Sequence, residues 1–198
     1  MRKAAVATIA LSILLTTGCA QAENPTQAPS QSIETTQTPA AISTASPSAP
    51  TVDKGVASTS ATAAQLSYLI EEEKLAHDVY TVMYETWGAR AFGNILNSEA
   101  NHQGQVLTVM SSLNVADPRS SELGVFTDPE LQALYNDLIA KGLKSVTDAY
   151  EVGVAIEELD IADLSDMLST ATDPNVISMM ENLRRGSENH LRAFNSRL

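Results

Sequence analysis

Residues 91–113 read AFGNILNSEANHQGQVLTVMSSL, and this stretch decides the fold. Its apolar side chains do not alternate but recur every three or four residues, as in an amphipathic helix. The apolar face consists of Phe92, Ile95, Val106, Val109, Met110 and Leu113. Glu99 and His102 fall on the same face. We therefore expect this helix to turn a carboxylate and an imidazole towards the core.

Three more long helices are predicted around this one. The first begins at a capping box, residues 62–65, and ends before Gly88. Another spans about 145–170, and the last opens at the Asp173-Pro174 pair, a strong N-cap followed by a proline in the first turn. No period-two strand pattern of useful length occurs, so the expected fold class is all-α.

The lengths of the connections predict how these helices are arranged. The turns at 87–90 and 171–173 are short, so each joins antiparallel neighbours. Roughly thirty residues join the two pairs, and a short helix from about 127–130 to Gly142 lies within them. One long crossover between the second and third long helices is typical of ferritin-like topology. The sequence thus predicts a ferritin-like four-helix bundle with one long crossover containing a short helix.

Residues 1–19 are expected to be a lipoprotein signal peptide. Two basic residues precede an apolar run at 4–15, which is short for a bilayer span and typical of a signal peptide. Residues 15–19, LTTGC, resemble a bacterial lipobox, although Thr16 stands where leucine is usual. Cys19 is the only cysteine in the sequence, and it would carry the lipid. An ordinary signal peptide cleaved just after this point is the alternative.

Residues 20–60 are expected to be a disordered tether, and 61–198 the folded domain. The tether is rich in Pro, Ser, Thr and Ala and has no aromatic residue, so it has little apolar surface to bury. We expect the protein in the cell envelope, lipid-anchored to a bacterial membrane and facing the periplasm or the exterior.

Composition excludes several kinds of partner and site. The formal net charge of −12 argues against nucleic acid as a partner. The single cysteine excludes an internal disulfide and a cysteine zinc site. The expected partner is the membrane, through the lipid on Cys19, and a homodimer is left open.

Charged and polar residues stand on the inward faces of all four long helices, where apolar residues are expected. At 1.5 Å per residue they fall near the middle of each helix. Buried charges are costly unless they are paired or bound to metal. The candidate metal ligands are Glu73, Glu99, His102, Glu157, Asp160 and His190. His77 and Ser187 are candidates to contact these ligands without binding the metal themselves.

Glu99-x-x-His102 has the spacing used in two-metal helical bundles, where the carboxylate bridges two ions and the imidazole binds one. We therefore predict two divalent metal ions, iron or manganese. The alternative is that the carboxylates reach solvent at the edge of the apolar stripe and that the histidines are hydrogen-bonded core residues.

Four strings resemble one known family: EEEKLAHDVY at 71–80, SEANH at 98–102, IEELDI at 156–161 and RGSENHLRAF at 185–194. The family is a bacterial and archaeal one, domain of unknown function 2202, in the ferritin-like superfamily and related to erythrin- and rubrerythrin-type domains. The resemblance covers residues 63–196. It implies a four-helix bundle with a di-iron or di-manganese centre.

Carried over residue by residue, the pattern of that superfamily matches Glu73, Glu99, His102, Glu157 and His190. The chain departs from it at the second Glu-x-x-His, where Ser187 stands in place of the glutamate. Asp160 could supply the missing carboxylate.

Two functions of different classes remain open. One is an oxidoreductase that oxidises ferrous iron or reduces peroxide or oxygen outside the cytoplasm, because two ferrous ions can share the electrons required. The other is a non-catalytic lipoprotein whose bundle binds a partner or sequesters metal.

Overall fold

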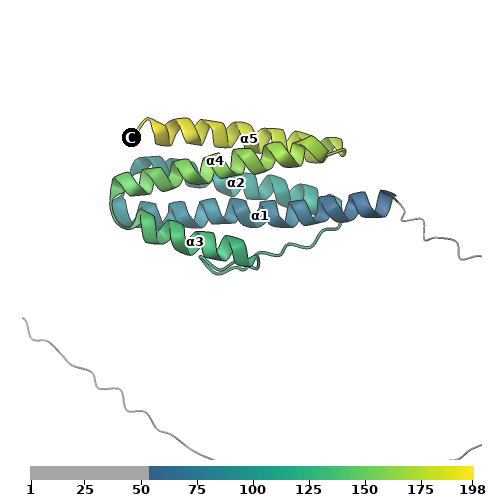
Figure 1. Ribbon diagram of the computed structural model, residues 1–198, viewed down its shortest axis with the longest axis horizontal. Coiled ribbons are helices and arrows are strands. Elements are labelled where there is room, and N and C mark those ends of the chain that lie inside the picture. The colour runs from purple at the N-terminus through teal and green to yellow at the C-terminus, as the bar shows by residue number, and fades with distance from the viewer. Residues whose placement is uncertain (1–53) are drawn as a thin grey trace, which may run out of the picture. The chain divides into compact units, whose positions relative to one another are not determined.

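The structure is a computed structural model that describes residues 54–198, and regular structure in that part of the chain is entirely helical. The five helices in order are α1 Lys54–Trp87, α2 Arg90–Ser112, α3 Pro129–Gly142, α4 Val146–Thr170 and α5 Pro174–Asn195 (Figure 1). The all-α prediction is confirmed for these residues. None of the five helices is both long and apolar enough to cross a bilayer. The predicted signal peptide, Cys19 and most of the predicted tether lie outside the described residues.

Most helix ends lie where the local sequence predicts them. Asp128 and Asp173 cap α3 and α5 by accepting hydrogen bonds from backbone N–H groups of the first turn, and each is followed by proline. Ser145 caps α4 in the same way. Gly88 ends α1 with a positive φ of 63°, and its N–H donates to the Tyr84 carbonyl at 2.8 Å. A glycine adopts this left-handed conformation without strain.

The start of α1 differs from the prediction. The helix begins at Lys54, so Thr62 lies inside it and is not its N-cap. Residues 54–60, which were assigned to the tether, are helical. No proline lies between Pro50 and Thr62, so nothing in this segment interrupts a helix that continues into the rest of α1. The capping-box spacing marks where a helix can begin, but it does not prevent one from beginning earlier.

The four long helices lie alongside one another (Figure 1). α1 packs against α2, and α4 packs against α5, as antiparallel pairs. The pairs meet where α1 contacts α4 and where α2 contacts α5. The connection after α2 runs back along the helices, and α3 then packs against α1 and α4.

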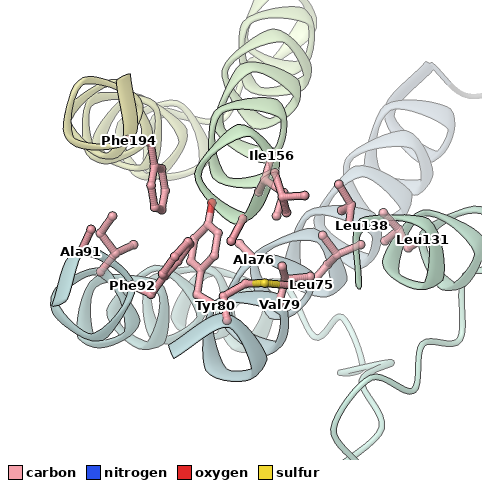
Figure 2. Packing of buried hydrophobic residues seen from close by; sticks show 14 of the residues in the cluster. Leu75, Ala76, Val79, Tyr80, Ala91, Phe92, Leu131, Leu138, Ile156 and Phe194 are labelled. Carbon is pink, nitrogen blue, oxygen red and sulfur yellow. The ribbon is translucent and has the colours of Figure 1, made fainter. Parts of the chain in front are cut away.

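Buried apolar side chains form two clusters, one towards each end of the four helices. In the first, the rings of Tyr80, Phe92 and Phe194 contact one another with centroids 5.2–5.8 Å apart (Figure 2). The second includes Leu66, Leu69, Ile70, Val106, Met110, Leu164, Met180 and Leu183. Each long helix contributes to both clusters. The residues between them therefore form a middle layer that is shielded from water at both ends.

Candidate metal centre

Charged and polar side chains fill the layer between the two apolar clusters. Every one of the predicted ligands lies there, and none exceeds 7% exposure: Glu73 on α1, Glu99 and His102 on α2, Glu157 and Asp160 on α4, and His190 on α5. The alternative in which these carboxylates reach solvent is therefore contradicted. Burying so many ionisable groups is costly unless they are paired with each other or with a cation.

Glu99 lies between the two buried histidines. Its Oε2 is 3.1 Å from His102 Nδ1, and its Oε1 is 2.8 Å from His190 Nδ1. Each histidine also faces a second carboxylate. His102 Nδ1 is 3.2 Å from Glu73 Oε2, and His190 Nδ1 is 3.5 Å from Glu157 Oε1. Two groups of three ligands result, both containing Glu99, and within each group the ligand atoms all lie within 4.8 Å of one another.

Several of these atoms approach one another without hydrogen bonding. Glu73 Oε1, Glu99 Oε1 and His190 Nδ1 are buried and have no hydrogen-bond partner, although the last two are only 2.8 Å apart. Buried polar atoms are almost always hydrogen-bonded, so such exceptions need an explanation. Ligands directed at a shared cation provide one. Carboxylate oxygen and imidazole nitrogen are donors that suit iron and manganese.

Asp160 belongs to neither group of three. Its Oδ2 accepts a short hydrogen bond from the Ser187 hydroxyl, and its Oδ1 is buried without a partner. Ser187 thus contacts a predicted ligand, as expected, and orients the Asp160 carboxylate. Ser187 occupies the position on α5 where a second Glu-x-x-His would have its glutamate.

His77 lies apart from this centre. Its side chain is 34% exposed, and its Nδ1 is 3.4 Å from the Asp78 carboxylate. It lines a surface cavity of about 510 Å³ together with Lys74 and Gln103. His77 therefore does not contact the ligands, contrary to the prediction. Its side chain extends from α1 into this surface cavity instead.

Residues 62–198 match the family described as an uncharacterized protein domain, DUF2202. The chain belongs to this family. It is 43% identical over 125 residues to the uncharacterized protein MJ0754 of Methanocaldococcus jannaschii, a match that covers 63% of this chain and 68% of that protein. The DUF2202 assignment made from the four sequence strings is confirmed.

A solved structure is similar as well. The crystal structure of hypothetical protein MJ0754 from Methanococcus jannaschii matches with a TM-score of 0.67 and 38% sequence identity. The match covers 76% of this chain and 83% of that one. This DUF2202 chain therefore has a helical fold similar to that of a solved structure.

The histidines and carboxylates of this candidate centre shift one another's pKa values. Burial alone would raise the pKa of Glu99, but His102 and His190 lower it to about 2. Burial alone would lower the pKa of His102, yet Glu73 and Glu99 raise it to about 11. The pKa of His190 rises to about 9 in the same way, through Glu157 and Glu99. In the metal-free protein both imidazoles are thus protonated at neutral pH and offset Glu99.

The remaining carboxylates are not offset. Burial raises the pKa of Glu157 to about 7 and that of Asp160 to about 6, in each case aided by the charge of Glu99. Burial and the charge of Asp160 also raise the pKa of Glu73 well above its usual value. These acids keep their protons to a higher pH than usual, because two histidines cannot balance them all. A divalent cation could replace those protons.

Two close contacts fix the ligands in place. The Tyr80 hydroxyl donates to Glu157 Oε1 at 2.7 Å, and Figure 2 shows its oxygen directed towards α4. Gly186 on α5 lies against the other edge of His102, where a Cβ would be 2.3 Å from Nε2. Any larger residue at Gly186 would push the imidazole away from its carboxylates.

Sequence reasoning missed the burial of the other charged residues in the run 71–74. Glu71 accepts hydrogen bonds from the N–H groups of Thr127 and Asp128 at 2.6 and 2.8 Å, and it thereby fastens the start of α3 to α1. Lys74 pairs with Asp78 and donates to the Glu122 carbonyl at 2.9 Å. Glu72 is only 2% exposed.

A signal for this burial exists in the sequence. Leu75 and Val79 are buried. They lie off the stripe that the helical period predicts for this helix, which consists of Leu66, Leu69, Ile70, Ala76, Tyr80, Met83 and Tyr84. A helix with apolar residues on a second face is covered on both sides. In the structure α3 and the connection before it cover that second face.

Proposed function

We propose that this DUF2202 chain is a ferritin-like four-helix-bundle protein that binds two divalent cations, iron or manganese, between its long helices. We propose further that the bound pair oxidises ferrous iron or reduces peroxide or oxygen. One observation carries the proposal: two groups of three ligands share Glu99 in a buried layer between two apolar clusters.

The helix arrangement supports the ferritin-like reading. Two antiparallel pairs, α1 with α2 and α4 with α5, are joined by a long connection that contains α3. Each of the four long helices contributes a ligand at the same level of the molecule. This topology and this origin of the ligands are characteristic of two-metal carboxylate bundles.

The residues of the centre have distinct roles in this proposal. Glu99 would contribute to both cations, Glu73 and His102 would hold one of them, and Glu157 and His190 would hold the other. Two redox-active cations in such a pair supply two electrons to a single oxidant. Tyr80 orients Glu157 through a hydrogen bond from its hydroxyl to Oε1.

Asp160 takes the role of the carboxylate that α5 lacks. The short bond from Ser187 occupies its Oδ2, while Oδ1 stays free of hydrogen bonds. We therefore propose that Oδ1 completes the coordination between the two sites. The apolar clusters on either side keep bulk water away from the pair, and a water-excluded site strengthens the electrostatic interactions within it.

We also propose that the protein is exported and held in the cell envelope by lipid on Cys19. This part of the proposal rests on the N-terminal sequence alone. An envelope location would give the centre iron or peroxide from outside the cytoplasm as reactants.

An aerobic iron assay tests the redox function. The purified chain is loaded anaerobically with ferrous iron, and oxidation after addition of oxygen or peroxide is followed by absorbance. We expect the wild type to oxidise iron faster than the buffer does and Glu99→Ala to match the buffer. Glu158→Gln, at an exposed position on α4, is the control and should behave as the wild type.

Two results would change the conclusion. Metal binding without accelerated oxidation would contradict the redox function and favour sequestration of metal. Accelerated oxidation that is equal in the wild type and Glu99→Ala would contradict the dinuclear site itself.

A further inference from the structure

The surface cavity into which His77 extends is separate from the dinuclear centre. Its volume is about 510 Å³, which is within the usual range for small-molecule sites. Its walls come from α1, from α2 and from the connection after α2, and none of the candidate metal ligands lines it. Segments distant in the sequence thus meet around a space that the proposed metal chemistry does not use.

Arg119 is a fixed cation in the wall of this cavity. It lies in the connection after α2, and its side chain is 17% exposed. Its guanidinium donates to both carboxylate oxygens of Asp117, at 3.0 and 2.8 Å, and to the side-chain oxygen of Gln103. A guanidinium has five N–H groups, and within residues 54–198 nothing accepts from those that remain. A guanidinium held in place with unused N–H groups is suited to an oxyanion.

Two side chains of α1 add donors to the same cavity. The Lys74 ammonium group donates to Asp78 and to the Glu122 carbonyl. One of its three N–H groups is thus unused by the described residues. His77 Nδ1 is 3.4 Å from Asp78 Oδ1, and Nε2 has no partner in the described part of the chain. A bound oxyanion would favour the doubly protonated ring, in which Nε2 donates as well.

The acidic residues of the lining are already engaged. Asp78 accepts from His77 on Oδ1 and from Lys74 on Oδ2. Asp117 accepts from Arg119 on both oxygens. The cationic side chains still have unused donors, whereas each carboxylate oxygen already has a partner. A ligand of this cavity must therefore supply acceptors.

The α2 wall of the cavity has a different character. Ala100, Gly104 and Leu107 line it at the i, i+4 and i+7 positions of one helix face, and they have no polar side-chain atom. A Cβ added at Gly104 would have no atom within 4 Å, so the space beside this wall is open. The wall can therefore contact the carbon skeleton of a ligand whose charged group lies against Arg119.

We propose that this cavity binds a small organic oxyanion of the phosphate monoester class. Arg119, Lys74 and His77 hold the phosphate group, whose several oxygens accept from donors on two walls, and the α2 wall contacts the organic part. The net charge of −12 does not prevent this, because salt screens the repulsion from distant charges beyond roughly 8 Å. The inference is independent of the dinuclear centre, since no candidate metal ligand takes part in it.

Phenyl phosphate and inorganic phosphate are the probes for the test, and phenol is the uncharged control. Isothermal titration is done on the full chain with a chelator present, so that no bound metal attracts the phosphate. We expect phenyl phosphate to bind, inorganic phosphate to bind more weakly and phenol not to bind. Arg119→Gln and His77→Ala should each weaken binding of phenyl phosphate by roughly tenfold or more.

Two further variants make the result specific. Arg192→Gln removes the same charge from an exposed position on α5 and should bind as the wild type. Ala100→Leu fills the space beside the α2 wall, so it should weaken binding of phenyl phosphate more than binding of inorganic phosphate. If circular dichroism shows that Arg119→Gln does not fold, His77→Ala decides the question, because this side chain is partly exposed and contacts only Asp78 by a polar group.

Four outcomes would overturn the proposal. The first is no binding of either phosphate by the wild type. The second is unchanged binding in both Arg119→Gln and His77→Ala, which would place the anion elsewhere. The third is equal weakening in Arg119→Gln and Arg192→Gln, because the effect would then come from net charge alone. The fourth is equal affinity of the wild type for the two phosphates, which would contradict an organic ligand on the α2 wall.

Discussion

At the scale of single residues, the centre depends most on Glu99, because each of its oxygens faces a different histidine. No other carboxylate belongs to both groups of three ligands. Its pKa of about 2 means that it is ionised at neutral pH. Loss of Glu99 should therefore affect both cations, whereas loss of Glu73 or Glu157 should affect one more than the other.

Glu99→Ala or His102→Ala should abolish stabilisation by metal while the helices still form. A ligand present at a hundred times its Kd stabilises the folded state by about 2.7 kcal/mol. For a domain of this size that is a rise in Tm of roughly 5–10 °C. Melting curves by circular dichroism, with and without manganese(II), give the comparison.

The same curves include their control. Glu158→Gln should keep the full rise in Tm, since its side chain is exposed on the outer side of α4. A rise in Tm that survives in both Glu99→Ala and His102→Ala would mean that the metal binds elsewhere.

At the scale of elements, the approach of α5 to α2 depends on a glycine. Gly186 lies where a Cβ would come within 2.3 Å of the His102 ring. We expect Gly186→Ala to displace the imidazole and to weaken manganese binding by roughly 10–100-fold, the usual effect of disturbing residues that support metal ligands. Isothermal titration of the metal measures this change.

Gly104→Ala on α2 is the matched control for Gly186→Ala. It is also a helical glycine, but no atom lies within 4 Å of an added Cβ. It should stabilise the protein by about 0.4–1 kcal/mol and leave manganese affinity unaltered. If Gly186→Ala behaves in the same way as Gly104→Ala, the close contact with His102 does not position that ligand.

Elements also differ in how far the sequence predicts them. The starts of α3, α4 and α5 are predictable because Asp128, Ser145 and Asp173 satisfy their own helix's N–H groups within one turn. The start of α1 is not, because nothing local stops a helix between Lys54 and Thr62. A cap is a local signal that marks where a helix begins. Without a cap, the helix extends towards the N-terminus until some other feature of the chain stops it.

The candidate ligands were predictable for a related reason. Glu99, His102 and His190 interrupt apolar stripes of regular period, so the sequence itself marks them as inward-facing. Glu72 could not be found in this way. It is buried because α3 and α4 both pack against α1, and the trace of this coverage in the sequence is the second apolar face that contains Leu75 and Val79.

At the scale of the whole molecule, buried titrating groups predict how stability depends on pH. In the metal-free protein the pKa values of Glu157, Asp160, His102 and His190 are all raised on folding. Each group therefore holds its proton to higher pH in the folded than in the unfolded state. The stability that each contributes is present below its unfolded pKa and is lost as pH rises through its folded pKa.

The metal-free protein should thus lose stability steadily from about pH 4 to about pH 11, the folded pKa of His102. Metal should have the opposite dependence, because cations displace the same protons and bind more tightly as pH rises. Chemical denaturation at a series of pH values, with and without manganese(II), measures both trends. A metal-free stability that increases between pH 5 and pH 8 would contradict the charge balance described for the centre.

Membrane attachment is a separate property of the whole chain. If Cys19 carries lipid, Cys19→Ala should move the protein from the membrane fraction to a soluble or unprocessed one, because acyl chains provide the membrane affinity. Fractionation and immunoblotting of cells that express each form test this. Cys19→Ser should behave as Cys19→Ala, and an unchanged membrane fraction in both would rule out lipid anchoring.

The central claim is that two cations share Glu99 in the layer between the apolar clusters. Anomalous diffraction from crystals of the protein grown with manganese(II), recorded at the manganese edge, tests it most directly. We predict one anomalous peak bounded by Glu73, Glu99 and His102 and a second bounded by Glu99, Glu157 and His190. A map in which this layer has no peak, while His102 and His190 stay within 4 Å of the same carboxylates, would contradict the claim.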